Sequence, residues 1–420
     1  MKYELDPEYV KGVEIKPYKK GAQYEEALKA AAGMNFSAGI WYFIYPMGDR
    51  FSPAQNLNTL TIEEGIEFCH RIGVKKVSFH YPGEYTDYNC DVIDGLLKER
   101  RMSVGSVAGN VFSAVQFKWG GPACHIKEIR DLALKVKMRA QEINARTGAN
   151  NHTDWAGRDG LDNYFLYEAE KQWEWTKELY VKILMAVEAK SGIAIEFKPY
   201  DAMEHSVLKN VDTALLFAEE VENEIARKVW QQLKKEKGRR ITHADFEKRF
   251  KPYDHCVGVN IEDAHVYLAG QKVAEAVRKS IAAKRLFLRH ENDCEGRIDN
   301  DLIFGSLHFW DALEATYVQI INKYDEKGGW HEPDIFPQRD DQLKAFIQSL
   351  NAINFFYALA RRIADEKKWA NRLEAVMEQK YASEANSFLF DLVSEGIEYN
   401  KIPLNLADKF RKEIGKPMKF

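Results

Sequence analysis

The chain has 420 residues, 45% of them hydrophobic, and a formal net charge of −4. The weakly negative net charge does not indicate a basic surface for binding nucleic acid. No apolar run reaches the roughly 18 residues that span a bilayer. The five cysteines are scattered without a CxxC pair, which favours a reducing compartment over a disulfide scaffold. The amino-terminal stretch is charged and does not resemble a signal peptide. These features predict a cytoplasmic protein that binds neither nucleic acid nor membrane.

Short β-branched or aromatic runs alternate with long amphipathic segments along the chain. Strand candidates lie at 35–44, 75–80, 102–109, 192–197, 256–261 and 285–290, with weaker ones at 151–156 and just before Asp334. Between them, helical periodicity occurs at 61–72, 126–145, 167–190, 264–282 and 302–323. About eight strand-then-helix units predict an α/β fold, namely a (β/α)₈ TIM barrel.

The pattern changes to almost pure helix near the carboxyl end. We therefore predict a catalytic barrel over 1–338 and a C-terminal helical arm over 339–420. The highly charged segment at about 207–251 is long for one crossover, so it predicts a helical insertion in the barrel. The arm favours a homodimer or homotetramer, because it offers a segment that can grip another subunit.

Polar side chains follow several of the predicted strands. Active sites of such barrels lie at the carboxyl ends of the strands, so these side chains are expected to meet. Most are carboxylates, and so many converging anions would repel each other strongly without cations. Oxygen ligands in this number suit magnesium, manganese or cobalt ions better than a thiolate-rich zinc site. The strand-end candidates are His80, Glu196, Lys198, Glu262, His265, Glu291, Asp299, Asp301 and Asp334.

The residues around these candidates match a known family in the order of its motifs. The segments concerned are Asn35–Trp41 with Arg50-Phe51, Phe79-His80, Trp155–Gly160, Glu196–Pro199, Asn260–His265 followed by Leu268–Gly270, and Asp299–Gly305. On these motifs, the chain resembles the xylose isomerases, particularly their shorter class, over about 35–365. The resemblance implies a metal-dependent aldose–ketose isomerase with a sugar substrate and a 1,2-hydride shift.

The resemblance also implies roles for individual residues. A first cation would use Glu196, Glu262, Glu291 and Asp334, and a second would share Glu262 and add His265, Asp299 and Asp301. Lys198 would hydrogen-bond the carbonyl oxygen of the sugar, and His80 would open the sugar ring. Asp301 would take part in proton movement at the second cation. Trp41, Trp155 and Phe51 would shield the substrate from water.

The chain also departs from the family's pattern. On the seventh strand, Glu291 matches the ligand position by register, and Asp293 is the alternative. The carboxylate that orients the histidine is either missing or has become Glu84. On the third strand, Ala108-Gly109 replaces a threonine pair and would leave space at the distal end of the sugar. We therefore expect a six-carbon or deoxy sugar to be turned over at least as well as D-xylose, and Gly109→Thr to reverse this preference.

Two other functions are compatible with the same barrel. A sugar epimerase would use two glutamates as acid and base around one metal, and it would not need the set formed by His265, Asp299 and Asp301. A noncatalytic or nucleic-acid-directed barrel would favour histidine-rich zinc clusters and a basic face. The sequence shows neither of these two features.

Overall fold

The computed structural model describes residues 34–49, 51–52, 54–149, 151–166, 168–201 and 204–418, with the side chain of Arg239 excepted. Arg50 and the first 33 residues of the predicted barrel domain lie outside the described residues. Within the described part, no helix is long and apolar enough to cross a membrane.

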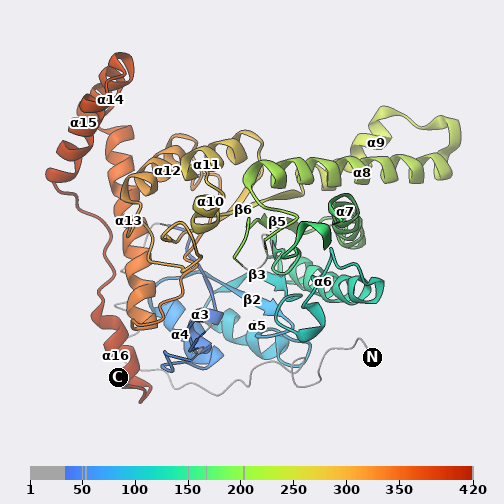
Figure 1. Ribbon diagram of the computed structural model, residues 1–420, viewed down its shortest axis with the longest axis horizontal. Coiled ribbons are helices and arrows are strands. Elements are labelled where there is room, and N and C mark those ends of the chain that lie inside the picture. The colour runs from blue at the N-terminus through green and yellow to red at the C-terminus, as the bar shows by residue number, and fades with distance from the viewer. Residues whose placement is uncertain are drawn as a thin grey trace.

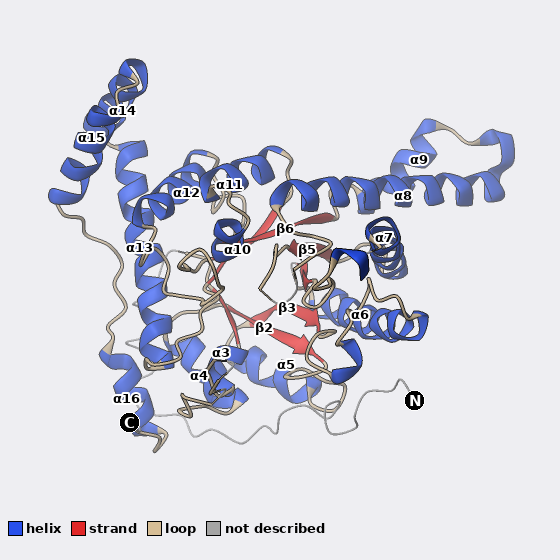
Figure 2. Ribbon diagram, in the orientation of Figure 1, coloured by secondary structure: helices blue, strands red, loops and turns tan. Residues whose placement is uncertain are grey.

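Eight parallel strands are found in the described residues, and helices surround them (Figure 1, Figure 2). The strands are β1 (Ser37–Gly39), β2 (Lys76–Tyr81), β3 (Ser103–Gly109), β4 (Asn151–Trp155), β5 (Gly192–Glu196), β6 (Val257–Glu262), β7 (Leu286–His290) and β8 (His331–Glu332). They pair in the order β1-β2-β3 and β4-β5-β6-β7-β8. The predicted (β/α)₈ TIM barrel is confirmed.

Two seams complete the barrel. A parallel bridge between Phe36 and His331 joins β1 to β8. Between β3 and β4, side chains replace the regular ladder: the Thr153 N–H donates to Ser106 Oγ at 2.8 Å, and the Gly109 N–H donates to His152 Nε2 at 3.1 Å. These side-chain bonds satisfy backbone donors that a ladder would otherwise pair.

A helix follows each strand on the outside of the barrel. These helices are α4 (Ile62–Arg71), α5 (Cys90–Glu99), α6 (Lys127–Thr147), α7 (Ala169–Ala186), α8 (Val211–Lys237), α10 (Asp263–Leu268) with α11 (Val273–Ala282), α12 (Phe309–Ile321) and α13 (Gln342–Asp365). The start of α4 illustrates how the sequence sets such an element. Thr61 and Glu64 form a capping box there, which satisfies two amide donors at the helix end.

The segment at 207–251 includes one of the barrel helices. The first half of α8 buries Val211, Phe217 and Val221, as expected for a crossover helix. Its second half projects from the body of the molecule, and α9 (His243–Phe250) folds back along it (Figure 1). The Trp230 and Phe246 rings meet at 5.9 Å between these two helices. The projecting part therefore begins within α8 rather than at residue 207.

The predicted boundary at residue 338 falls just before α13. This helix follows β8 and buries many side chains, including Leu343, Phe346 and Leu350, so we place the last barrel helix here. Beyond it, α14 (Lys367–Gln379) and α15 (Ala382–Ser394) project outward, as Figure 1 shows. The last helix, α16 (Asn405–Glu413), returns to the barrel, where Arg411 Nε donates to Asp341 Oδ2 at 2.7 Å. The division into two domains stays a prediction.

Candidate active site

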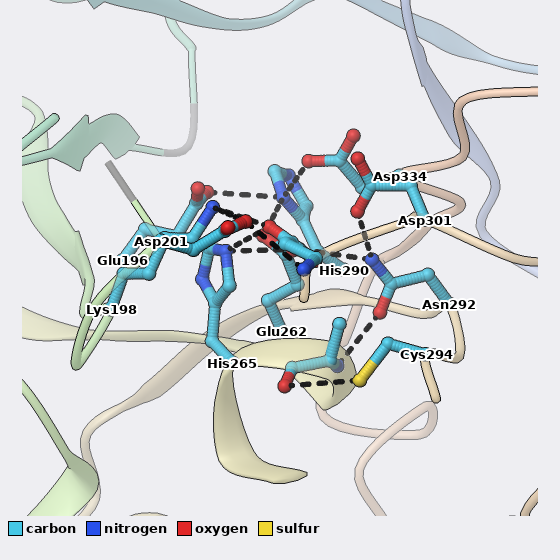
Figure 3. A network of polar contacts seen from close by, with 12 residues as sticks. Glu196, Lys198, Asp201, Glu262, His265, His290, Asn292, Cys294, Asp301 and Asp334 are labelled. Carbon is cyan, nitrogen blue, oxygen red and sulfur yellow. Dashed lines mark hydrogen bonds and ion pairs between the residues drawn. The ribbon is translucent and has the colours of Figure 1, made fainter. Parts of the chain in front are cut away.

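The candidate site is a cavity of about 270 Å³ at the carboxyl ends of the strands. Side chains from opposite sides of the barrel line it, including Trp41, His80, Trp155 and Glu262. Figure 3 shows how carboxylates and imidazoles from β5, β6, β7 and the following loops converge there. The strand-end rule used on the sequence therefore led to this cavity and to the polar groups that line it.

The first ligand group combines three carboxylates with one imidazole. One donor atom from each of four residues lies within 4.8 Å of the others, namely Glu196, Glu262, His290 and Asp334. His290 Nδ1 lies 3.1 Å from Glu196 Oε2 and 3.2 Å from Asp334 Oδ2 (Figure 3). Outside the group, Tyr42 donates its hydroxyl to Asp334 Oδ1 at 2.5 Å, which fixes that carboxylate.

The second ligand group shares Glu262 with the first. It adds His265 and Asp299, with His265 Nε2 at 2.9 Å from Asp299 Oδ2 and 3.3 Å from Glu262 Oε1. Glu262 thus directs Oε1 to the second group and Oε2 toward His290 of the first, 3.8 Å away. A carboxylate with one oxygen in each group has the form of a bridging ligand.

Asp301 lies beside both groups without belonging to either set of close donors. Asn292 Nδ2 donates to Asp301 Oδ1 at 3.0 Å and to Glu262 Oε1 at 2.9 Å, so one amide holds both carboxylates in place. Burial raises the pKa of Asp301, and the Asp299 and Asp334 carboxylates raise it further. A carboxyl group with a raised pKa is suited to carry a proton at neutral pH.

The structure corrects the choice of ligand on the seventh strand. Glu291 does not reach the cavity, because successive side chains of a strand point to opposite faces and His290 is the one that points inward. Glu291 Oε1 instead lies 2.6 Å from His331 Nδ1 on the outer face. The alternative, Asp293, accepts hydrogen bonds from the backbone of Leu307 and His308. The strand-end rule would have found His290, because the predicted strand itself ended there.

The donor atoms fit divalent cations. Burial raises the pKa of Glu262 to about 8, and the Asp334, Asp299 and Glu196 carboxylates add to this effect. Among the described residues, Glu262 Oε2 and Asp299 Oδ1 are buried without a hydrogen-bond partner. Buried anionic oxygens need a compensating partner, and dications supply one. Oxygen and imidazole nitrogen donors without thiolates suit magnesium, manganese or cobalt.

Lys198 lies against the second ligand group. Its ammonium donates to Asp299 Oδ2 at 2.6 Å and lies 5.6 Å from the centre of the Trp155 ring. Burial acts to lower the pKa of Lys198, but the Asp299 and Asp301 carboxylates outweigh it and raise the pKa. The side chain is therefore a fixed positive charge that lines the cavity.

His80 lines the opposite wall, and Glu84 orients it. Glu84 Oε2 lies 3.1 Å from His80 Nδ1 and also accepts the His80 backbone N–H at 2.6 Å. The Trp41 ring lies 4.4 Å from the imidazole. Of the two possibilities left open by the sequence, the structure shows that Glu84 supplies the orienting carboxylate.

Aromatic rings form the remaining wall. Trp155 lines the cavity and packs at 4.7 Å against Phe112, a ring that the sequence analysis did not identify. Phe112 also lies 5.5 Å from His80, so it links two predicted site residues. Phe51 is 81% exposed and does not line the cavity within this chain. Its assignment to substrate binding stays a prediction.

Comparison with known proteins agrees with this arrangement. No protein-family model matches the chain. A xylose isomerase from Thermus thermophilus is 26% identical over 253 residues, which are 56% of this chain and 57% of that protein. The match thus spans little more than half of that relative's length. The predicted resemblance to the xylose isomerases is confirmed.

Solved structures share the fold of this xylose isomerase-like chain. An L-ribulose 3-epimerase has a TM-score of 0.56 at 11% identity, covering 79% of this chain and 97% of its own. A D-psicose 3-epimerase from Clostridium cellulolyticum, solved with D-tagatose, has a TM-score of 0.52 at 12% identity and covers 77% of this chain and 98% of its own. At such identities the likeness supports the barrel fold alone.

The structure also corrects the expectation for the third strand of this xylose isomerase-like chain. Gly109 lies against α6, and a Cβ added there would lie 2.8 Å from Lys137 Cγ and 3.1 Å from Lys137 Cα. The space expected from the missing side chain is therefore filled by a helix. Ala108, the register partner of His80, and Gly109 both line the cavity.

We expect Gly109→Thr to lower the free energy of unfolding by about 1–3 kcal/mol, because it overpacks the contact with α6. It is not expected to change sugar preference.

Ala108→Thr is expected to narrow the cavity and shift the kcat/KM ratio toward five-carbon sugars by about two- to tenfold, within the range of one hydrogen bond or a small steric change. Kinetics with five-carbon and six-carbon sugars measure the preference of Ala108→Thr, and urea denaturation measures the stability of Gly109→Thr. An unchanged kcat/KM ratio between the two sugar lengths in Ala108→Thr would contradict the prediction that residue 108 lies against the substrate.

Removing the carboxylate beside His80 is expected to change the pH dependence of turnover. Burial opposes the charged imidazole, and the Glu84 carboxylate outweighs it, so the pKa of His80 stands above its usual value. Glu84→Gln removes the charge and leaves burial dominant, which lowers that pKa. The limb of the kcat/KM profile that follows His80 should then move to lower pH. A profile that coincides with that of the unchanged protein would show that His80 does not control this limb.

Proposed function

We propose that the chain is a metal-dependent sugar isomerase that interconverts an aldose and its ketose by a 1,2-hydride shift. The observation that carries this proposal is Glu262, whose two oxygens face two separate ligand groups. A paired site suits this reaction, because two cations held there would supply charge both for holding substrate hydroxyls and for polarising the carbonyl. The relative from Thermus thermophilus, a xylose isomerase by name, supports the same class of reaction.

The chain's own residues would then have distinct tasks. Bound divalent cations would supply Lewis-acid charge for holding hydroxyls and polarising the carbonyl. Lys198 would donate a hydrogen bond to the carbonyl oxygen as negative charge grows there. Asp301 would hold and pass the proton that moves between the two sugar oxygens. His80, oriented by Glu84, would transfer a proton during ring opening.

The walls of the cavity fit a hydride shift. Trp41, Phe112 and Trp155 surround the space beside the polar groups with apolar rings. Excluding water there would protect the migrating hydrogen from exchange and strengthen the electrostatic interactions of the site. The proposal extends to a cytoplasmic homodimer or homotetramer that acts on a small sugar.

A sugar epimerase is the second candidate, and His290 favours it. With this imidazole, the first group is a complete set of four donors for a single cation. Glu196 and Asp334 both lie close to His290 Nδ1, so an acid and a base could act around one metal. The second ligand group, which an epimerase does not need, keeps the isomerase as the first candidate.

Removing metal is expected to abolish activity. EDTA-treated protein should lose turnover of aldoses, and added magnesium, manganese or cobalt should restore it. A cation present at 100 times its Kd should also add about 2.7 kcal/mol to the free energy of unfolding, because it binds only the folded chain. Elemental analysis, melting curves and a panel of pentoses, hexoses and deoxyhexoses measure these effects. Full activity of metal-free protein would refute the proposal.

The two candidate reactions differ in the fate of one hydrogen. A hydride shift carries the substrate hydrogen from C2 to C1 without exchange, whereas acid–base epimerisation passes it through exchangeable carboxyl groups. Turnover in D₂O followed by NMR should therefore give a ketose with little deuterium at C1. Stoichiometric deuterium at the inverted carbon of a ketose substrate would establish the epimerase instead.

A further inference from the structure

A buried carboxylate lies directly beneath the first ligand group. Glu332 is the register partner of His290 on the neighbouring strand, and both side chains line the cavity. Glu332 is 1% exposed. Ser78, from β2, donates its hydroxyl to Glu332 Oε2 at 2.8 Å. The other oxygen, Oε1, has no hydrogen-bond partner among the described residues.

The imidazole of His290 faces Glu332 Oε1. Its Nε2 lies 3.6 Å away, while Nδ1 of the same ring faces Glu196 and Asp334. A buried carboxylate oxygen without a hydrogen-bond partner raises the free energy of the folded state. An imidazole N–H that faces this oxygen stabilises it, whereas an imidazole lone pair does not. The carboxylate therefore favours the proton on Nε2, which leaves the lone pair of the neutral ring on Nδ1.

We propose that Glu332 is a positioning residue that fixes His290 in the tautomer whose Nδ1 faces the first ligand group. The inference rests on the proposed metal-dependent function, since the Nδ1 lone pair is the one that a cation at this group would use. Ser78 holds the carboxylate in turn, so a chain of contacts runs from β2 through β8 to β7 beneath the cavity. Carboxylates that orient metal-binding histidines raise the affinity for the metal in this way.

The same strand pair provides a matched control. Glu291 is also 1% exposed and also faces a histidine, His331, but on the outer side of the barrel. Glu291→Gln and Glu332→Gln therefore make the same change in charge at equal burial, and only the second lies against the ligand group. A general effect of removing a buried carboxylate would appear in both variants.

The test is direct binding of manganese or magnesium by isothermal titration, in the full chain and in a His265→Asn background that weakens the second group. We expect Glu332→Gln to weaken the first site by about 10- to 100-fold, as typical for such supporting carboxylates, and Glu291→Gln to leave it within about threefold. Ser78→Ala, which retains the carboxylate, should also weaken metal binding at the first site, but by less than Glu332→Gln does. This milder variant also serves if Glu332→Gln does not fold.

A spectroscopic readout tests the tautomer itself. In magnesium-loaded protein with ¹⁵N-labelled histidine, the long-range ¹H–¹⁵N spectrum should show the His290 proton on Nε2, with the signal assigned from a His290→Asn variant. A proton on Nδ1, or equal metal affinity in Glu332→Gln and the unchanged protein, would overturn the inference alone. Absence of metal binding by the unchanged protein would instead overturn the proposed function, and the inference with it.

Discussion

Replacing Glu262 with glutamine is expected to remove high-affinity binding at both ligand groups and to lower kcat/KM by more than about 100-fold. Loss of a residue that only supports a ligand costs about 10- to 100-fold, and Glu262 faces both groups directly. The loss should fall mainly on kcat, because carbonyl polarisation is needed in the transition state. Steady-state kinetics and metal content of the purified variant measure the two effects together.

The stability of this variant separates loss of a ligand from loss of the fold. Burial and neighbouring carboxylates disfavour the charged form of Glu262, as its raised pKa shows. Glutamine removes that buried charge, so the metal-free variant should melt no lower than the metal-free parent. The increase in Tm on adding metal should be much smaller. Glu291→Gln is the control that should retain metal and turnover, and near-normal kcat in Glu262→Gln would refute the bridging assignment.

Replacing Lys137 with methionine is expected to lower the free energy of unfolding by about 3–5 kcal/mol, the cost of leaving one partner of a buried ion pair alone. Lys137 on α6 pairs with Asp154 on β4, and the two side chains are 0% and 3% exposed. The pair lies behind the third and fourth strands, where side chains replace a regular ladder. Urea denaturation of the metal-free protein measures the change.

Two further variants test the physical cause. Lys137→Met combined with Asp154→Leu removes both charges and should recover most of the lost stability, because no unpaired anion remains buried. Lys127→Met breaks an exposed pair with Asp131 on the same helix and should cost less than about 1 kcal/mol. Equal losses in Lys127→Met and Lys137→Met would show that burial is not the cause.

The sequence by itself determined the class of fold and most of the candidate site. Alternating strand and helix patterns predicted the barrel, because each pattern has its own hydrophobic period. The carboxyl ends of parallel strands meet at one end of such a barrel, so Glu196, Glu262 and Asp334 were expected to converge, and they do. His265 and Asp299 followed from the same rule, applied together with the family resemblance.

Only the tertiary structure decided which face each side chain takes. A shift of one residue in a strand turns a side chain from the cavity to the outer layer, so the register taken from the family motif selected Glu291, whereas His290 lines the cavity. The same ambiguity concealed that a side chain added at Gly109 would meet Lys137 of α6. Glu332 was not among the predicted site residues for a related reason. Its proposed positioning role depends on its place beside His290, and the two residues become neighbours only when β7 and β8 pair.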